Sequence, residues 1–172
     1  MVFALFAIIL GQVTMIAIYA SRYKRVPPNQ ALVVYGRRSR PGVAREGFIV
    51  LVGGGKFIVP IVETFSLLSL APFVVEVKIE DAGGAGCELL AAAKLTREPE
   101  GLRRAAQNLL DKPIEEVRAV AATILEGHAR DLLSRELSPR DPEFAEKLEA
   151  ATRPDYDKIG LEIVGKVVVR AG

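Results

Sequence analysis

The first twenty residues constrain this chain more than any other stretch. Residues 1–20 contain no Asp, Glu, Lys or Arg, and Arg22, Lys24 and Arg25 follow at once. A helix of this length spans roughly 30 Å, the thickness of the hydrocarbon core of a bilayer. It also satisfies its backbone polar groups internally, as lipid requires. The segment 1–21 is therefore predicted to be a transmembrane or membrane-inserted helix that anchors the chain.

A cleavable signal peptide is the alternative for this segment. Such peptides carry their positive charge before a shorter apolar core and end in small residues, whereas here the cations follow the apolar run. The positive-inside bias then places the residues after Ser21 on the cytoplasmic side of the cell membrane. The N-terminus is expected to lie outside or to loop within the bilayer, so the chain is single-pass or membrane-inserted.

Charge is distributed unevenly, although its sum is small. With 23 Lys and Arg against 21 Asp and Glu, no strong overall field predicts a nucleic-acid partner. Seven cations precede the first acid, Glu46, and those nearest the apolar segment can each gain about 1 kcal/mol from anionic lipid. The alternative is that these cations only set topology and border a solvated turn. The predicted lipid-contact residues are Arg22, Lys24, Arg25, Arg37, Arg38 and Arg40.

A single cysteine and a single histidine limit the available chemistry. Cys87 and His128 allow neither an internal disulfide nor a Cys/His metal cluster, so no metal and no cofactor is predicted. Cys87 is interpreted as a small buried side chain, with palmitoylation as the alternative. His128 lies on the apolar stripe of a predicted helix, which favours a hydrogen-bonded core or boundary residue over a catalytic base or metal ligand. Gly127 weakens the same helix and predicts that another element packs closely there.

Short strands are predicted after the apolar segment. Two successive prolines force residues 26–29 into an extended form. Glycines 53–55 are predicted to make a turn with positive φ angles; a phosphate-binding loop is rejected, because Val50 and Phe57 occupy positions where it needs Gly and Ser or Thr. The pattern indicates a small antiparallel sheet or barrel. Its strands are predicted at residues 31–35, 48–52, 57–59 and 64–70.

The second half begins with the least ambiguous strand of the sequence. Residues 73–80 alternate between apolar and charged side chains, and residues 87–96 are predicted to return beside them. The apolar period then changes to that of helices, predicted at about 98–111, from 114 to about 132, and from 142 to about 151. A last strand at 161–170 is predicted to join the sheet that begins at Phe73.

This order of strands, helices and a final strand indicates an α+β fold. The predicted organisation has three parts. They are a membrane anchor at 1–21, a small antiparallel β subdomain at 22–71 and an α/β subdomain at 72–172.

Several motifs, taken in order, resemble one known family. They are VPPNQALVV at 26–34, GGGKFIVPI at 53–61, ILEGHAR at 124–130 and IGLEIV at 159–164. Together, behind an apolar N-terminal segment, they resemble the flotillin branch of the stomatin, prohibitin, flotillin and HflK/C superfamily. The resemblance covers nearly the whole chain. It implies that an SPFH domain, also called a band 7 domain, follows the anchor.

The chain departs from the family pattern in two places. Residues 81–96, DAGGAGCELLAAAKLT, replace a longer hairpin, which implies an altered sheet in the second subdomain. The family also continues past its closing strand into a helical region that drives assembly, whereas this sequence stops at Gly172. The resemblance therefore implies a shortened member, or one that assembles through its SPFH domain alone.

The resemblance also implies a function. It predicts a membrane-anchored scaffold that forms homo-oligomers and organises lipids and membrane proteins, with the bilayer and a small membrane protein of the NfeD type as partners. The alternative is a regulator or accessory subunit of a membrane protease, as in the HflK/C branch. A hydrolase using Ser66 or Ser69 with Lys56 rests only on their proximity in sequence. Because the G-x-S-x-G, H-E-x-x-H and dinucleotide motifs are absent from the sequence, we expect no enzyme activity.

Overall fold

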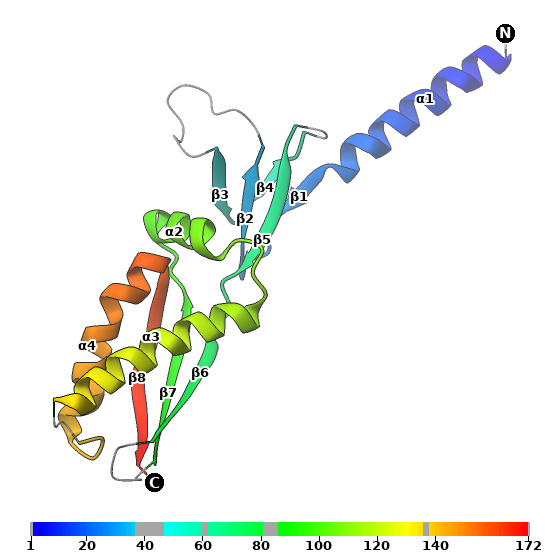
Figure 1. Cartoon of the computed structure of the whole chain (residues 1–172). Coiled ribbons are helices and arrows are strands. Elements are labelled where there is room, and N and C mark those ends of the chain that lie inside the picture. The colour runs from blue at the N-terminus through cyan, green and yellow to red at the C-terminus, as the bar shows by residue number, and fades with distance from the viewer. Residues whose placement is uncertain (1, 37–46, 60–61, 81–85, 136–137, 172) are drawn as a thin grey trace. The chain divides into compact units, whose positions relative to one another are not determined.

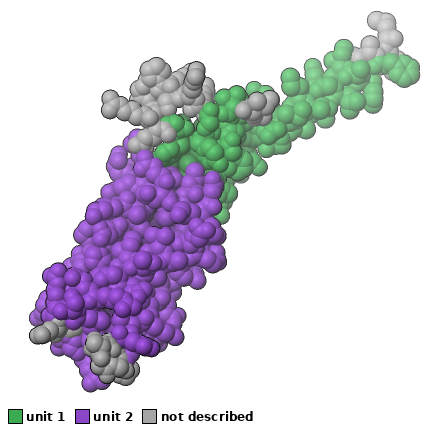
Figure 2. Space-filling view, in the orientation of Figure 1, with its two compact units in different colours: residues 1–68 green, residues 69–172 purple. Residues whose placement is uncertain are grey.

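The computed structural model describes residues 2–36, 47–59, 62–80, 86–135 and 138–171. The chain divides into two compact units, residues 1–68 (unit 1) and residues 69–172 (unit 2), which Figure 2 colours separately. Unit 1 contains α1 (Val2–Ser21), β1 (Tyr23–Arg25), β2 (Gln30–Tyr35), β3 (Phe48–Val52), β4 (Gly55–Phe57) and β5 (Thr64–Ser69), which ends at the boundary. Unit 2 contains β6 (Phe73–Glu80), β7 (Gly86–Leu95), α2 (Pro99–Leu109), α3 (Ile114–Ser134), α4 (Pro142–Ile159) and β8 (Leu161–Ala171) (Figure 1).

The N-terminal helix α1 is 20 residues long and its described side chains are exposed. Its polar side chains bond to their own helix: the Thr14 hydroxyl donates to the Leu10 carbonyl at 2.8 Å, and the Ser21 hydroxyl to the Ile18 carbonyl at 2.8 Å. Within the described part of the chain, no helix combines the length and the apolarity needed to cross a membrane. The transmembrane form of the predicted anchor is therefore not supported. The membrane-inserted form stays a prediction.

The strands of unit 1 form two small sheets. One pairs β1 with β4, and the other has the order β3-β2-β5. Strand β2 is the most buried, and its Leu32 and Val34 pack with Val26 and Ile58 in one hydrophobic cluster, with Leu51 at its edge. The strands predicted at 31–35 and 48–52 form β2 and β3, which pair antiparallel. The predicted positive-φ turn is confirmed at Gly53 and Gly54.

Two details of unit 1 correct the sequence prediction. The strand predicted at 57–59 lies at Gly55–Phe57, and its partner is β1, which the sequence did not predict. All three residues of β1 are exposed, so no alternation of apolar and polar side chains marked it. The strand exists because its backbone pairs with β4.

Unit 2 is a three-stranded antiparallel sheet, in the order β6-β7-β8, with helices on one face. The predicted strands at 73–80, 87–96 and 161–170 and the joining of the last strand to this sheet are confirmed. Alternate residues of β6 and β7 are buried, because α3 lies against β6 and α4 against β8 (Figure 1). Cys87 is one of these buried residues, as predicted. The opposite face of the sheet carries the exposed residues of the alternation.

The helices begin as predicted, but α4 ends later. Its predicted end near residue 151 is wrong, because the helix continues through Pro154 to Ile159. A proline inside a helix costs about 3 kcal/mol and removes one backbone hydrogen bond. The inward face nevertheless continues with Leu148, Thr152 and Tyr156, all 0% exposed, and the burial of this stripe offsets that cost.

Candidate membrane-contact surface

The predicted cationic site begins where α1 ends. The backbone N–H of Arg22 donates to the Tyr19 carbonyl at 3.2 Å, after which the chain passes directly into β1. Arg22, Lys24 and Arg25 are all exposed. Strand β1 is held by β4, with Lys24 opposite Lys56 and Arg25 opposite Gly55. The short sheet therefore holds Lys24 and Arg25 near the end of the apolar helix, and the Arg22 carbonyl accepts the Ile58 N–H at 3.1 Å.

Aromatic side chains surround these cations. The ring of Tyr19, in the last turns of α1, stacks on Phe57 of β4 with centroids 4.8 Å apart and planes inclined by 27°. The Lys24 ammonium lies 5.4 Å from the ring centroid of Phe65, which is within the range of a cation–π contact. Tyr23, which lies between Tyr19 and Lys24 in the sequence, is 50% exposed. Tyrosine side chains, which combine an apolar ring with a polar hydroxyl, suit a membrane interface.

A buried ion pair lies behind this surface. Lys56 Nζ lies 3.4 Å from Glu63 Oε1, and the Glu63 side chain is only 1% exposed. The other carboxylate oxygen of Glu63 accepts the backbone N–H of Val59 at 3.0 Å. The Lys56 charge is thereby partly neutralised. Among the described residues, no acidic group lies within ion-pair distance of Arg22, Lys24 or Arg25.

The three cations after α1 were predicted from the sequence, whereas the buried ion pair was not. The structure brings Arg22, Lys24 and Arg25 together, whereas Arg37, Arg38 and Arg40 lie outside the described residues. Glu63 was missed. Its signal was a single acid within the otherwise apolar and polar-neutral stretch 57–70.

Apolar side chains are exposed on the same unit. Besides α1, the strands and turns of unit 1 expose large aliphatic and aromatic groups. A surface that combines apolar side chains with exposed cations can bury the apolar groups among acyl chains and place the cations at anionic headgroups. The exposed large apolar residues after α1 in unit 1 are Tyr23, Ile49, Val52, Val59, Val62, Phe65 and Leu67.

The geometry gives no support to the serine hydrolase hypothesis. Lys56 pairs with Glu63. The Ser69 hydroxyl accepts the backbone N–H of Ala71 at 3.4 Å, which is a local turn contact. Among the described residues, no three His, Cys, Asp or Glu side chains gather as a metal site requires.

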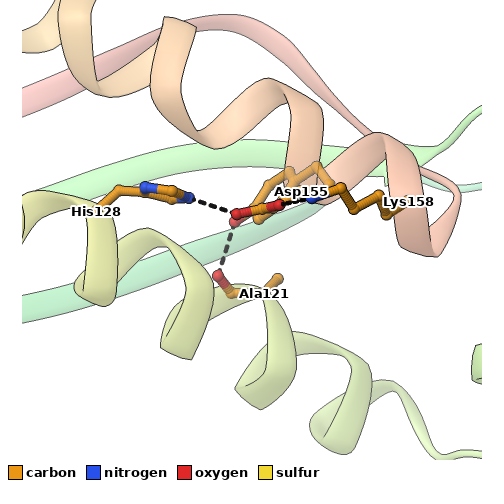
Figure 3. A network of polar contacts seen from close by, with 5 residues as sticks. Ala121, His128, Asp155 and Lys158 are labelled. Atoms are coloured by element: carbon orange, nitrogen blue, oxygen red, sulfur yellow. Dashed lines mark hydrogen bonds and ion pairs between the residues drawn. The ribbon is translucent and has the colours of Figure 1, made fainter.

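A separate polar cluster in unit 2 ties α3 to α4 (Figure 3). His128 Nε2 lies 2.8 Å from Asp155 Oδ2, and Lys158 Nζ donates to Asp155 Oδ1 at 2.7 Å. The Tyr156 hydroxyl donates to the Ala121 carbonyl at 2.8 Å. The hydrogen bond from Lys158, followed by that from His128, lowers the pKa of Asp155, and burial raises the pKa of Tyr156. His128 is thus a hydrogen-bonded residue at the edge of the core, as predicted.

Gly127, beside His128, corrects another prediction. We expected close packing at this position, but the space around a Cβ built at Gly127 is empty to 4 Å. The buried stripe of α3 runs through Val117, Ala121, Leu125 and Ala129 instead. This places Gly127 on the exposed side of the helix.

Comparison with known proteins matches most of the chain. The sequence profile of the SPFH domain / Band 7 family matches residues 24–171. Flotillin-2a of Danio rerio and flotillin-2 of Carassius auratus are each 27% identical over 148 residues, which cover 81% of this chain and 34% of each relative. The chain therefore spans about a third of the length of the curated relatives it matches.

Proposed function

The chain belongs to the SPFH domain / Band 7 family and is flotillin-like, and from this premise we propose that it is a membrane-associated scaffold whose copies associate and organise lipids and membrane proteins. The observation that carries the proposal is the junction between α1 and β1. There a helix with exposed apolar side chains meets three exposed cations, of which Lys24 and Arg25 lie on a two-stranded sheet. Such a junction suits the boundary between acyl chains and headgroups.

In this proposal α1 inserts its apolar side chains into the bilayer and the cations stay at the headgroups. Arg22, Lys24 and Arg25 each contribute about 1 kcal/mol near anionic lipid, and Arg37, Arg38 and Arg40 are proposed as further contacts. On the positive-inside bias we propose that the residues after Ser21 lie on the cytoplasmic side of the cell membrane.

The scaffold function follows from confinement. Weak contacts between chains become effective when the membrane holds many copies in two dimensions, because their effective concentration rises. A membrane protein of the NfeD type and a membrane protease are the partners that the family suggests. Co-purification of either with the full chain is the direct test of that part, and regulation of a protease is the alternative function.

The lipid contact is tested with the full chain and vesicles. We expect the change of Arg22, Lys24 and Arg25 to Glu to weaken sedimentation with vesicles of phosphatidylcholine and phosphatidylserine by about 100-fold, because roughly 3 kcal/mol of attraction is lost. The matched control reverses Arg97, Lys112 and Arg118, which are exposed cations of unit 2. Equal binding by both triple variants would contradict the lipid contact.

Insertion of α1 is tested separately. Lysines in place of Ile9 and Ile16, which are 52% and 67% exposed, would each cost about 2.5 kcal/mol or more in an apolar environment. On vesicles without phosphatidylserine, where only insertion supports binding, we expect this double variant to lose binding. The control Thr14→Ser should bind as the unchanged protein does. Retained binding would show that α1 stays in water.

A further inference from the structure

The face of the β6-β7-β8 sheet that the helices leave open carries apolar and charged side chains in a regular arrangement. Its residues alternate with the buried ones along β6 and β7, and β8 adds the residues opposite them, with a bulge between Val164 and Val168. Val74, Val164 and Val168 on this face are 56%, 36% and 50% exposed, and Leu90 and Ala92 lie between them on β7. These five aliphatic residues form the apolar centre of the open face.

The strand register arranges the open face in rows that cross the sheet. Two central rows are mainly apolar: Val74, Ala92 and Val164 lie side by side in one, and Glu76, Leu90 and Val168 in the next. A charged row lies beyond each of them. One contains Lys94 and Glu162, and the other contains Lys78, Glu88 and Arg170.

Both charged rows are ordered by ion pairs within the chain. Lys94 Nζ lies 2.9 Å from Glu162 Oε1. Glu88 lies between two cations, 3.9 Å from Lys78 and 3.7 Å from Arg170. From β7 to β8, the row of Lys94 and Glu162 is positive then negative. The row of Glu88 and Arg170 is negative then positive.

This opposite order makes the face complementary to itself, and we propose that two copies of the chain pack these sheet faces together about a two-fold axis. An axis parallel to the rows, between the two central rows, keeps each strand opposite its own copy and exchanges the rows. Lys94 then faces Glu88 of the second copy, and Glu162 faces Arg170 of the second copy. Val164 and Ala92 face Val168 and Leu90 of the second copy. Sheets stack in this way at about 10 Å.

The size of the face predicts a weak dimer. Three strands about 4.8 Å apart and roughly eight residues long cover on the order of 370 Å², about half of the ~800 Å² per partner of a stable interface. Association therefore needs the confinement that the proposed membrane function supplies, and in that respect it rests on the proposed function. Glu76 faces Val74 of the second copy in this arrangement, on the edge strand β6, where its carboxylate can reach water at the border of the interface.

A charge-exchange cycle tests the two-fold arrangement. Residues 162 and 170 pair with Lys94 and Glu88, six residues apart on β7, and so lie about 20 Å apart, so their changes should be independent within a chain. The quantity to measure is energy transfer between full chains that carry donor or acceptor dyes at Glu115→Cys and are bound to phosphatidylserine-containing vesicles. Glu162→Arg and Arg170→Glu should each weaken pairing about 10-fold, and the double variant should recover to within about threefold. Only a contact between chains makes opposite charges of positions 162 and 170 meet again.

The controls separate this inference from the membrane proposal. Glu143→Lys, on an exposed ion pair of α4 with Lys147, should leave pairing unchanged. Vesicle sedimentation should be the same for all four chains of the cycle. Failure of the unchanged chain to sediment with vesicles would count against the membrane proposal, whereas normal sedimentation with additive losses and no recovery would overturn the two-fold arrangement.

Cross-linking gives a second test that does not depend on charge. Cysteines at Val164 in one population and Val168 in another should form a mixed disulfide under mild oxidation several-fold faster than either population alone. Cys87 stays out of reach because it is 5% exposed. Equal rates would overturn the arrangement. So would protection of Val168→Cys from a water-soluble thiol reagent at vesicle densities too low for pairing, because lipid would then cover the face.

Discussion

The two units bury their polar groups in different ways. In unit 1 the buried polar group is a charge, Glu63, which pairs with Lys56 beside a cluster of only a few aliphatic side chains. In unit 2 the deepest polar groups are neutral, the Tyr156 and Thr152 hydroxyls, within an extensive layer between sheet and helices. The comparison indicates that unit 1 depends on one electrostatic contact and unit 2 on apolar packing.

This difference follows from size. A small unit cannot bury enough apolar surface to be stable by that means alone. Most of the largest fully buried side chains belong to unit 2, among them Tyr156, Phe144, Leu89 and Leu125. A buried ion pair adds little net stability to a fold, but removing one partner is costly, so each unit has its own point of weakness.

The largest effect is expected from Phe144→Ala. Phe144 is 0% exposed on the inward face of α4, and its truncation should destabilise unit 2 by about 3–5 kcal/mol. Hydrogen exchange read by mass spectrometry should show lost protection in residues 69–172 and unchanged protection in β2 and β3. Phe65→Ala, at a residue 37% exposed in unit 1, is the control and should change little. Loss of protection throughout the chain would break the comparison, because the units would then unfold together.

Glu63→Gln should have the next largest effect, and in unit 1. Gln keeps an acceptor for the Val59 N–H but leaves the Lys56 charge unpaired in a half-buried site, which should cost about 2–3 kcal/mol. Hydrogen exchange should show lost protection in β2 and β4 only. Adding Lys56→Met removes the unpaired charge and should recover part of the loss. If the double variant is no better than the single one, the ion pair is not what stabilises unit 1.

A smaller, pH-dependent effect is expected in unit 2. Because hydrogen bonds from Lys158 and His128 lower the pKa of Asp155, its contribution to stability is present above the ordinary aspartate pKa of about 3.9 and is lost as the pH falls through the folded value. The melting temperature of Asp155→Asn should therefore lie below that of the unchanged chain at pH 7, and the difference should shrink as the pH falls below about 3.9. Glu80→Gln, at an exposed residue of β6, should follow the unchanged chain at every pH.

Sequence reasoning succeeded where the pattern was periodic. Apolar residues at 73, 75, 77 and 79 alternate with charged residues at 76, 78 and 80, and the resulting strand and its partner formed as predicted. So did the helical stripe at Leu102, Ala105, Ala106 and Leu109. The cations at Arg22, Lys24 and Arg25 could also be located, because they follow the apolar segment directly.

Sequence reasoning failed where tertiary contacts override local signals. Strand β1 has no apolar alternation and forms through pairing with β4. Helix α4 continues through Pro154 because its own residues Thr152 and Tyr156, on the inward face, are buried. Glu63 finds Lys56 seven positions away across a turn, a contact that no spacing rule marks. Each of these contacts joins segments whose approach depends on the rest of the fold.

The smallest effect is expected at Gly127, and its sign sharpens the comparison. A Cβ at this exposed helical position meets nothing within 4 Å, so Gly127→Ala should stabilise unit 2 by about 0.5–1 kcal/mol through the lower entropy of the unfolded chain. Gly36 of unit 1 is the matched counterpart. Its φ is +101°, and a Cβ there would lie 2.8 Å from the Val62 carbonyl oxygen, so Gly36→Ala should destabilise.

Urea titrations followed by circular dichroism, with hydrogen exchange to assign each change to its unit, measure both substitutions. Opposite signs would support an open α3 surface in unit 2 and a closely packed turn in unit 1. A destabilising Gly127→Ala would instead mean that another chain packs against α3. The measurement is therefore repeated on vesicles at the surface density used for the pairing experiments. The two-fold arrangement through the open sheet face leaves α3 on the outer side of the dimer, so the stabilisation should persist there.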